Sequence, residues 1–367
     1  MPIKINQIIQ FLETFAPSAY QESYDNAGLL VGQADTTLTG ALITLDCTEA
    51  VVEEAIARQC NLIIAHHPIV FKGLKRFTGS HYVERTVIKA IQNQVAIYAT
   101  HTNLDNVIYG VSHHIADRLS LKNIKILAPK KHLLMKLTTF CQPADTAAVL
   151  EALYAAGAGH IGNYANCSFR LTGTGTFLPN EAAEPQVGEK GQLTETKEER
   201  VEVIFPARLE GKVMQALHEA HPYDEVAYYL HRLENTYQQV GSGVIGTLAQ
   251  AMDANDFLVY LKDRMELPCI RHTALVKPTV QKVALCGGAG FFLLPKAIQQ
   301  QADVYITADV KYHDFFEAQD KIILADIGHY ESEVFTKDLI ASILSQKFTN
   351  IAIRLSNINT NHVNYLM

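Results

Sequence analysis

Three short stretches of the sequence place histidine and carboxylate side chains together, each at the end of an apolar run. They contain four histidines and two carboxylates, namely His66, His67, His101, Asp105, His329 and Glu333. Imidazole and carboxylate ligands together suit zinc, iron, manganese, cobalt or nickel, and no thiolate belongs to the set. The residue types therefore predict a centre that binds divalent metal ions.

The number of candidate ligands is enough for two ions. His66, His67 and His329 with the two carboxylates can hold ions ~3.5–4 Å apart that share a bridging carboxylate, as in dinuclear hydrolases. Such ions lower the pKa of a bound water and polarise a phosphoryl or carbonyl oxygen. His101 is left over, and three roles are open to it: a proton shuttle, a sixth ligand, or a residue that supports a ligand.

Each of these residues also has an ordinary structural explanation. Asp105 could cap a turn in "NLDN", and Glu333 could offset the dipole at the start of a helix. The coincidence of three such clusters, all after apolar runs, favours a metal centre over these explanations. Asp309 and His313 in "TADVKYHDF" are weaker candidates, and whether they line the same site stays open.

Other polar or glycine-rich stretches have simpler interpretations. The stretch "CGGAG", residues 286–290, lacks the G-x-G-x-x-G and glycine-lysine-serine patterns of phosphate-binding loops, so we expect a tight strand-to-helix turn. The stretch "HPYDE", residues 221–225, is expected to be a turn between a helix and a strand. The charge run "ETKEER" is expected to be a solvated face, within a polar loop that follows residue 185.

The apolar runs that precede the candidate ligands are expected to be parallel strands. Strand patterns at 40–48, 61–67 and 95–102 alternate with helix patterns at 49–60 and 82–94, and Thr48 is a candidate N-cap. Nearly continuous apolar strands indicate a parallel sheet covered by helices on both faces. Sites in such sheets form beyond the carboxyl ends of the strands, which is where all three clusters would lie on one sheet.

A different pattern occupies residues 130–233. The order strand, helix, strand, strand, helix, strand predicts a ferredoxin-like α+β insert. The α/β pattern resumes afterwards, with an amphipathic helix at 331–346. We therefore expect one parallel-rich α/β domain, made of residues 1–129 and 234–367, that is interrupted by the insert.

Composition limits the classes of protein to consider. The 367 residues carry a net charge of -7, which argues against nucleic acid as a general partner. No apolar run reaches the ~18 residues of a membrane-spanning helix, and the N-terminal stretch has the pattern of an amphipathic helix. The six scattered cysteines include no C-x-x-C pair, which favours free thiols and a cytoplasmic location.

The order of the motifs resembles the Nif-three-like family, whose members are called GTP cyclohydrolase I type 2 homologues. The motifs are "YDNAGLLVG", "IIAHHPIVF", "ATHTNLDNV", "ALCGGAG", "ITADVKYHD" and "DIGHYESE", and "GHIGNYANCSF", "GTGTFLP" and "HPYDEVAYYL" in the insert resemble the long bacterial branch. That branch carries a domain similar to the PII and CutA proteins. Ala289 and Ala308 stand where serine and glycine are expected in many members.

The resemblance implies a specific site and assembly. Two divalent ions per chain, zinc first and iron, manganese, cobalt or nickel as alternatives, would be held by His66, His67, Asp105, His329 and Glu333. Glu333 would bridge the ions, and His101 would line the site as a catalytic residue. The family also implies a toroidal homohexamer whose metal sites face an internal cavity.

Two functions follow as expectations. The first is a metal-dependent hydrolase that acts on a nucleotide or phosphoester, because the family label implies opening of the imidazole ring of GTP. No residue pattern for guanine recognition is visible in the sequence. The second is a non-catalytic metal-binding regulator or scaffold, whose insert binds a small molecule or a partner.

Overall fold

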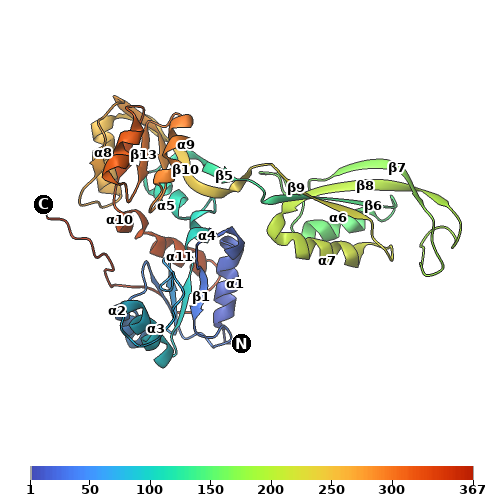
Figure 1. Ribbon diagram of the computed structural model, residues 1–367, viewed down its shortest axis with the longest axis horizontal. Coiled ribbons are helices and arrows are strands. Elements are labelled where there is room, and N and C mark those ends of the chain that lie inside the picture. The colour runs from blue at the N-terminus through green and yellow to red at the C-terminus, as the bar shows by residue number, and fades with distance from the viewer. Residues whose placement is uncertain (1, 367) are drawn as a thin grey trace. The chain divides into compact units, whose positions relative to one another are not determined.

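The structure is a computed structural model that describes residues 2–366, and it divides into two compact units. The first unit, here called the α/β unit, runs up to Ala128 and resumes at Gln239. The second, here called the insert unit, comprises Pro129–Gln238 and contains the whole of the predicted insert (Figure 1). Each unit has its own hydrophobic core, so the two are described separately.

The first sheet of the α/β unit has five strands in the order β1-β4-β3-β2-β15. They are β1 (Gly28–Val31), β2 (Ala41–Thr44), β3 (Leu62–Ala65), β4 (Ala96–Ala99) and β15 (Ile353–Leu355). All neighbours are parallel except β1, which pairs antiparallel with β4. Every residue of the three central strands is buried, as expected for a sheet that is covered on both faces.

Helices cover this sheet. They are α1 (Ile5–Phe15), α2 (Glu49–Ala57), α3 (Tyr82–Gln92) and α11 (Thr336–Ser345). Helices α2 and α3 pack together, and α1 packs with α11 (Figure 1). The hydroxyl oxygen of Thr48 accepts a hydrogen bond from the backbone N–H of Val51, so the predicted N-cap of α2 is confirmed.

The α/β unit contains a second sheet, and the expectation of a single sheet is therefore wrong. Its order is β11-β14-β13-β12-β10-β5. The strands are β5 (Lys122–Lys130), β10 (Tyr237–Asp253), β11 (Arg271–His272), β12 (Thr279–Leu285), β13 (Val304–Thr307) and β14 (Ile323–Asp326). Strands β12, β13 and β14 are parallel, whereas β10 and β11 pair antiparallel with them. Periodicity reveals strands but not their partners, which is why the second sheet was not foreseen.

Further helices lie between the strands of the α/β unit, and two of them carry candidate ligands. They are α4 (Thr102–Asp105), α5 (Val111–Arg118), α8 (Ala254–Arg264), α9 (Leu294–Gln299) and α10 (His329–Glu333). The amphipathic helix predicted at 331–346 is broken into α10 and α11. Strand β14 ends at Asp326, and His329 is the first residue of helix α10.

The insert unit has the ferredoxin-like topology that the sequence predicts. Its elements are β6 (Leu134–Cys141), α6 (Thr146–Ala155), β7 (Phe169–Phe177), β8 (Thr194–Pro206), α7 (Glu210–Ala220) and β9 (Tyr228–Leu233). The sheet order is β7-β8-β6-β9, and all pairs are antiparallel (Figure 1). One prediction is wrong in detail, because β8 begins at Thr194 and the charge run "ETKEER" is part of this strand. The finer likeness to PII and CutA stays a prediction.

Two further observations concern the chain as a whole. Within residues 2–366, no helix combines the length and the apolar character that a membrane span requires. All six cysteines are free thiols in the structure, and Cys47, Cys60 and Cys141 are buried.

We predict that removal of divalent ions leaves the protein folded. The cores of both sheets are formed by apolar side chains, so neither core needs a metal ion to close it. Chelation should lower the midpoint of thermal unfolding by about 5–15 °C, through loss of ligand binding to the native state. Circular dichroism before and after dialysis against a chelator measures this shift. Loss of the cooperative transition would show that the metal ions are structural.

Candidate metal centre

The structure brings all six predicted site residues together in the α/β unit. His66 and His67 immediately follow β3. His101 immediately precedes α4, and Asp105 is the last residue of α4. His329 and Glu333 are the first and last residues of α10, which follows β14 of the second sheet. The site is therefore made by segments at the carboxyl ends of strands from both sheets of the unit.

One group of ligand atoms is centred on His66. Its side chain is fully buried, and Nδ1 lies 2.8 Å from the carbonyl oxygen of Thr100, to which it donates. This hydrogen bond leaves Nε2 as an acceptor, 3.6 Å from Asp105 Oδ1 and 3.9 Å from Glu333 Oε1. Nε2 is buried and makes no hydrogen bond to any described residue. An unpaired buried nitrogen that faces two carboxylates is the arrangement expected of a metal ligand.

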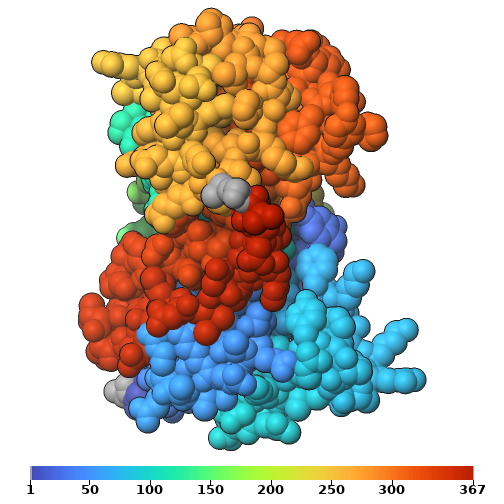
Figure 2. All heavy atoms as spheres, turned by 90° about the vertical axis from the view of Figure 1, so that its left-hand side faces the viewer, coloured from blue at the N-terminus to red at the C-terminus, as the bar shows by residue number. Residues whose placement is uncertain are grey.

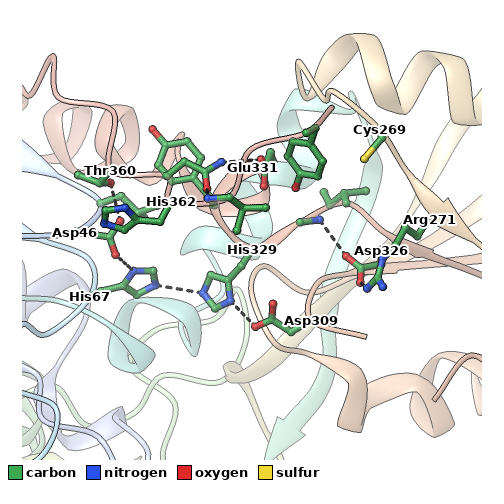
Figure 3. Close-up of a pocket in the computed structure, with 17 residues that line it drawn as sticks. Asp46, His67, Cys269, Arg271, Asp309, Asp326, His329, Glu331, Thr360 and His362 are labelled. Carbon is green, nitrogen blue, oxygen red and sulfur yellow. Dashed lines mark hydrogen bonds and ion pairs between the residues drawn. The ribbon is translucent and has the colours of Figure 1, made fainter. Parts of the chain in front are cut away.

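A second group is centred on the other oxygen of Glu333. Oε2 lies 2.9 Å from His67 Nε2 and 3.1 Å from His329 Nε2. The two Nε2 atoms are themselves 3.4 Å apart, and Figure 3 shows the two rings facing each other. Since each ring directs its Nδ1 to another carboxylate, the neutral forms of both rings present their Nε2 lone pairs to the same point. A cation at that point relieves the repulsion between these acceptors.

The carboxylate of Glu333 joins the two groups. Its Oε1 belongs to the set with His66 and Asp105, and its Oε2 belongs to the set with His67 and His329. Within each set the ligand atoms lie within 4.8 Å of one another. Ligands that share one ion at ~2.0–2.2 Å are about 3–4 Å apart, so the donor atoms suit two ions without large movement.

Each accessible histidine is oriented by a carboxylate on its outer side. Asp46 Oδ1 lies 2.8 Å from His67 Nδ1, and Asp309 Oδ2 lies 2.7 Å from His329 Nδ1 (Figure 3). Such carboxylates hold the ring and fix the tautomer that directs Nε2 inward. Asp309, left open by the sequence, therefore belongs to the site.

His101 is oriented in the same way but belongs to neither of the Glu333 sets. Its Nδ1 lies 2.8 Å from Asp25 Oδ1, and its ring centre lies 5.3 Å from that of His66. His101 also forms a separate potential ligand group with His66 and His67. His313, the other open candidate, lies in the turn Tyr312–Ala318 with its ring 5.1 Å from Tyr312, and it belongs to no ligand group among the described residues.

Two carboxylates of the site, Asp46 and Asp25, are not among the residues that the sequence predicts. Asp46 follows β2, so the strand-end rule that found the histidines could also have found it. Asp25 lies in the irregular segment before β1, inside the motif "YDNAGLLVG", where no periodicity signals a site. The hydroxyl and backbone N–H of Thr102 donate to Asp25, which places it at the start of α4.

Opposite charges stabilise one another in this cluster. Burial disfavours the ionised form of Glu333, but the imidazoles of His329, His66 and His67 outweigh it and hold the pKa of Glu333 well below the usual range. Burial likewise disfavours the protonated form of His67, yet Asp46 and Glu333 raise its pKa to about 10. Glu333 and Asp309 raise the pKa of His329 to about 9 in the same way. The cluster therefore has a strong preference for positive charge.

The thiol of Cys286, near the cluster, does not contribute to this preference for positive charge. Burial, with Asp105 as a second cause, raises the pKa of Cys286 to about 12, so its sulfur stays protonated. The available donors are thus imidazole nitrogens and carboxylate oxygens, as the sequence predicts.

The glycine-rich stretch 286–290 is a tight turn that packs against Glu333. Two of its N–H groups are bonded to side chains: that of Gly288 donates to Ser332 Oγ at 2.9 Å, and that of Gly290 to Thr307 Oγ1 at 2.9 Å. These donors are therefore not free to hold a phosphate. A Cβ atom on Gly288 would overlap Glu333 Oε1, and its φ of +60° also favours glycine.

Two cavities open beside His67. The first, of about 440 Å³, also reaches His329 and is walled by the C-terminal segment 360–365 (Figure 3). Figure 2 shows this segment in dark red on the surface, and Thr360 donates to Asp46 at 2.7 Å. The second cavity, of about 600 Å³, is lined by Phe71, Lys72 and Tyr82. The candidate centre is thus accessible from outside.

The fold and the site define a two-sheet α/β protein with a ferredoxin-like insert and a histidine–carboxylate cluster that could hold metal. Residues 3–362 match the family described as Duf34/NIF3 (NGG1p interacting factor 3), and the chain belongs to this family. The resemblance inferred from the motifs is therefore confirmed.

Individual relatives agree over the full length. The chain is 36% identical to the GTP cyclohydrolase 1 type 2 homolog of Bacillus subtilis (strain 168) over 368 residues, which is 98% of each protein. It is also 36% identical to the protein of that name from Halalkalibacterium halodurans, again over 98% of each. A solved Bacillus cereus protein related to NIF3 is 35% identical, with a TM-score of 0.88 over 100% of both chains.

We predict that Glu333→Gln loses both metal ions, whereas Asp105→Asn weakens only one. Glu333 contributes an oxygen to each ligand set, while Asp105 contributes to the set with His66 alone. Elemental analysis after identical purification measures the metal content per chain. Equal losses in the two variants would contradict the shared-carboxylate arrangement.

We also predict that Gly288→Ala reduces metal affinity by about 10–100-fold, the usual effect of disturbing a ligand's surroundings, while the protein stays folded. The added Cβ displaces Glu333 Oε1. Gly162→Ala is the matched control, because Gly162 has a similar φ of +56° with no atom within 4 Å of the added Cβ. Competition with a chelating dye measures the affinity. An unchanged value in Gly288→Ala would show that the turn does not position Glu333.

Proposed function

We propose that this protein is a hydrolase that uses two divalent metal ions to act on a phosphoester or nucleotide. One observation carries the proposal: the two oxygens of the buried Glu333 carboxylate face two separate sets of ligand atoms. Two ions held by these residues would lower the pKa of a bound water and polarise a phosphoryl oxygen. A carboxylate shared between two imidazole-containing sets is typical of hydrolytic centres rather than of structural zinc, which favours thiolates.

His101 is proposed as the residue that moves a proton during the reaction. Burial raises the pKa of Asp25, but hydrogen bonds from His101 and Thr102 outweigh it and lower the pKa to about 2. Asp25 is therefore ionised at neutral pH, accepts from His101 Nδ1, and stabilises the imidazolium that forms when Nε2 takes a proton. This pairing of an ionised carboxylate with a histidine is the arrangement used in general acid–base catalysis.

The cavity of about 600 Å³ supports a phosphorylated substrate with a flat group. Lys72 lines it together with His67, so a phosphoryl group beside the metal ligands would meet a positive charge. The ring of Phe71 lies 6.3 Å from that of His101 and 6.4 Å from that of Tyr24. Phe71 and Tyr24 are 45% and 65% exposed, which leaves their faces available for stacking on a base.

The name shared by the relatives directs the choice of first substrate. Because they are called GTP cyclohydrolase 1 type 2 homologs, we propose GTP, with hydrolytic opening of its imidazole ring, as the first reaction to test. The family resemblance also supports zinc as the native ion and a toroidal homohexamer of the 40.7-kDa chain. The scattered free thiols support a cytoplasmic location.

The test combines metal content with turnover. We expect about two divalent ions per chain by elemental analysis, and hydrolysis of GTP or of the phosphodiester bis(4-nitrophenyl) phosphate by the metal-loaded protein. Turnover of either substrate should disappear on chelation and return when the ion is restored. Two bound ions without turnover of any nucleotide or phosphodiester would favour the non-catalytic regulator instead.

We predict that Asp25→Asn and His101→Gln each lower kcat by about 10²–10⁴-fold while both ions stay bound. Neither residue belongs to the two Glu333 ligand sets, so metal content separates a loss of proton transfer from a loss of metal. Asp35→Asn is the matched control, because the Asp35 side chain is 83% exposed and pairs only with surface groups in the structure described. Loss of metal together with activity in His101→Gln would make His101 a ligand instead.

A further inference from the structure

The insert unit contains a cavity of about 530 Å³ that the metal centre does not use. All of the residues that line it lie between positions 140 and 229, so it is formed by the insert unit alone. It opens where the ends of β6, β7 and β9 meet the long connection from Leu178 to Leu193. Its volume lies in the range of ~300–1,000 Å³ that small-molecule sites occupy.

The connection that forms one wall is held in place by hydrogen bonds. The N–H of Gly191 donates to the carbonyl oxygen of Pro179 at 2.8 Å, which closes the connection on itself. The N–H of Glu184 donates to Asp224 Oδ2 at 2.8 Å, which fixes the connection to the turn before β9. A wall with such bonds is largely formed before a ligand arrives, as in most small-molecule sites.

Aromatic side chains form much of the remaining wall. They are Phe140, Phe177, Tyr223 and Tyr229. The rings of Phe140 and Tyr229 pack edge to face with centres 5.6 Å apart, and Tyr229 is 56% exposed. Exposed ring faces beside a cavity attract cations through the negative potential over the ring.

Carboxylates supply the charge of the cavity. Glu198, Asp224 and Glu225 line it, and the lining that the structure describes includes no lysine, arginine or histidine. Glu198 Oε1 accepts a hydrogen bond from Tyr223 at 2.9 Å. Its Oε2 lies over Gly175, where any Cβ atom would overlap it, so the glycine makes room for the carboxylate at the cavity wall.

We propose that this cavity is a binding site for an organic ammonium ion that carries an apolar or aromatic body. The aromatic walls match the body, and the three carboxylates match the charge. An anionic ligand would meet only carboxylates among the charged side chains of the wall, and a neutral ligand would leave their negative charge without a counter-charge. The proposal does not depend on the metal centre, because no candidate metal ligand contributes to the cavity.

The test uses three probes with one indole body on the full-length protein. Tryptamine carries an ammonium group, tryptophol a hydroxyl group, and indole-3-acetate a carboxylate. Isothermal titration calorimetry should show tryptamine bound at least about tenfold more tightly than the other two, the usual gain from a charged partner. Equal affinities, a preference for the acid, or no binding of any probe at millimolar concentration would overturn the proposal.

Two variants test whether the preference for tryptamine arises in this cavity. Glu198→Gln keeps an acceptor for Tyr223 but removes the charge, and Glu225→Gln removes an exposed charge that the fold does not need. Each should reduce the affinity for tryptamine and leave that for tryptophol unchanged. Glu195→Gln is the matched control, because Glu195 is exposed on the same strand and does not line the cavity. An unchanged preference for tryptamine in both cavity variants would place the binding elsewhere and overturn the proposal.

Discussion

The organisation of the α/β unit depends on how the buried carboxylate of Glu333 is compensated. Glu333 is 4% exposed, and an ionised group at that depth costs several kcal/mol unless opposite charges or donors meet it. His329 of its own helix meets one oxygen, and His66 and His67, which follow a strand of the other sheet, complete the surroundings. The same interaction therefore links the two sheets and assembles the candidate centre.

This dependence explains why sequence reasoning located the site although it predicted the wrong number of sheets. His66 and His67 follow β3, and His329 follows β14, so the strand-end rule applied separately to each sheet. The rule does not say that two sheets face each other with these ends together. That arrangement comes from strand pairing, which depends on contacts distant in sequence and leaves no local pattern.

Local sequence patterns predict the fold best where elements that are neighbours in the sequence are also neighbours in space. The ferredoxin-like order of the insert could be predicted because each of its strands is recognisable and the fold follows from their sequence. The start of β8 was missed, because a run such as "TETKEE" with one face in solvent looks like a loop. Asp25 was missed for a different reason: its role comes from its contacts with His101 and Thr102, 76 and 77 residues further along the chain.

The chemistry of the two units argues for two different ligands. The candidate metal centre concentrates acceptor atoms around points that favour positive charge, and divalent ions held there would attract anionic groups such as phosphoryl oxygens. The cavity of the insert unit presents carboxylates and aromatic faces, which repel those same groups. The phosphorylated substrate proposed above would suit the first and be disfavoured in the second. The insert cavity is thus better suited to the separate ammonium ligand proposed for it than to the proposed substrate.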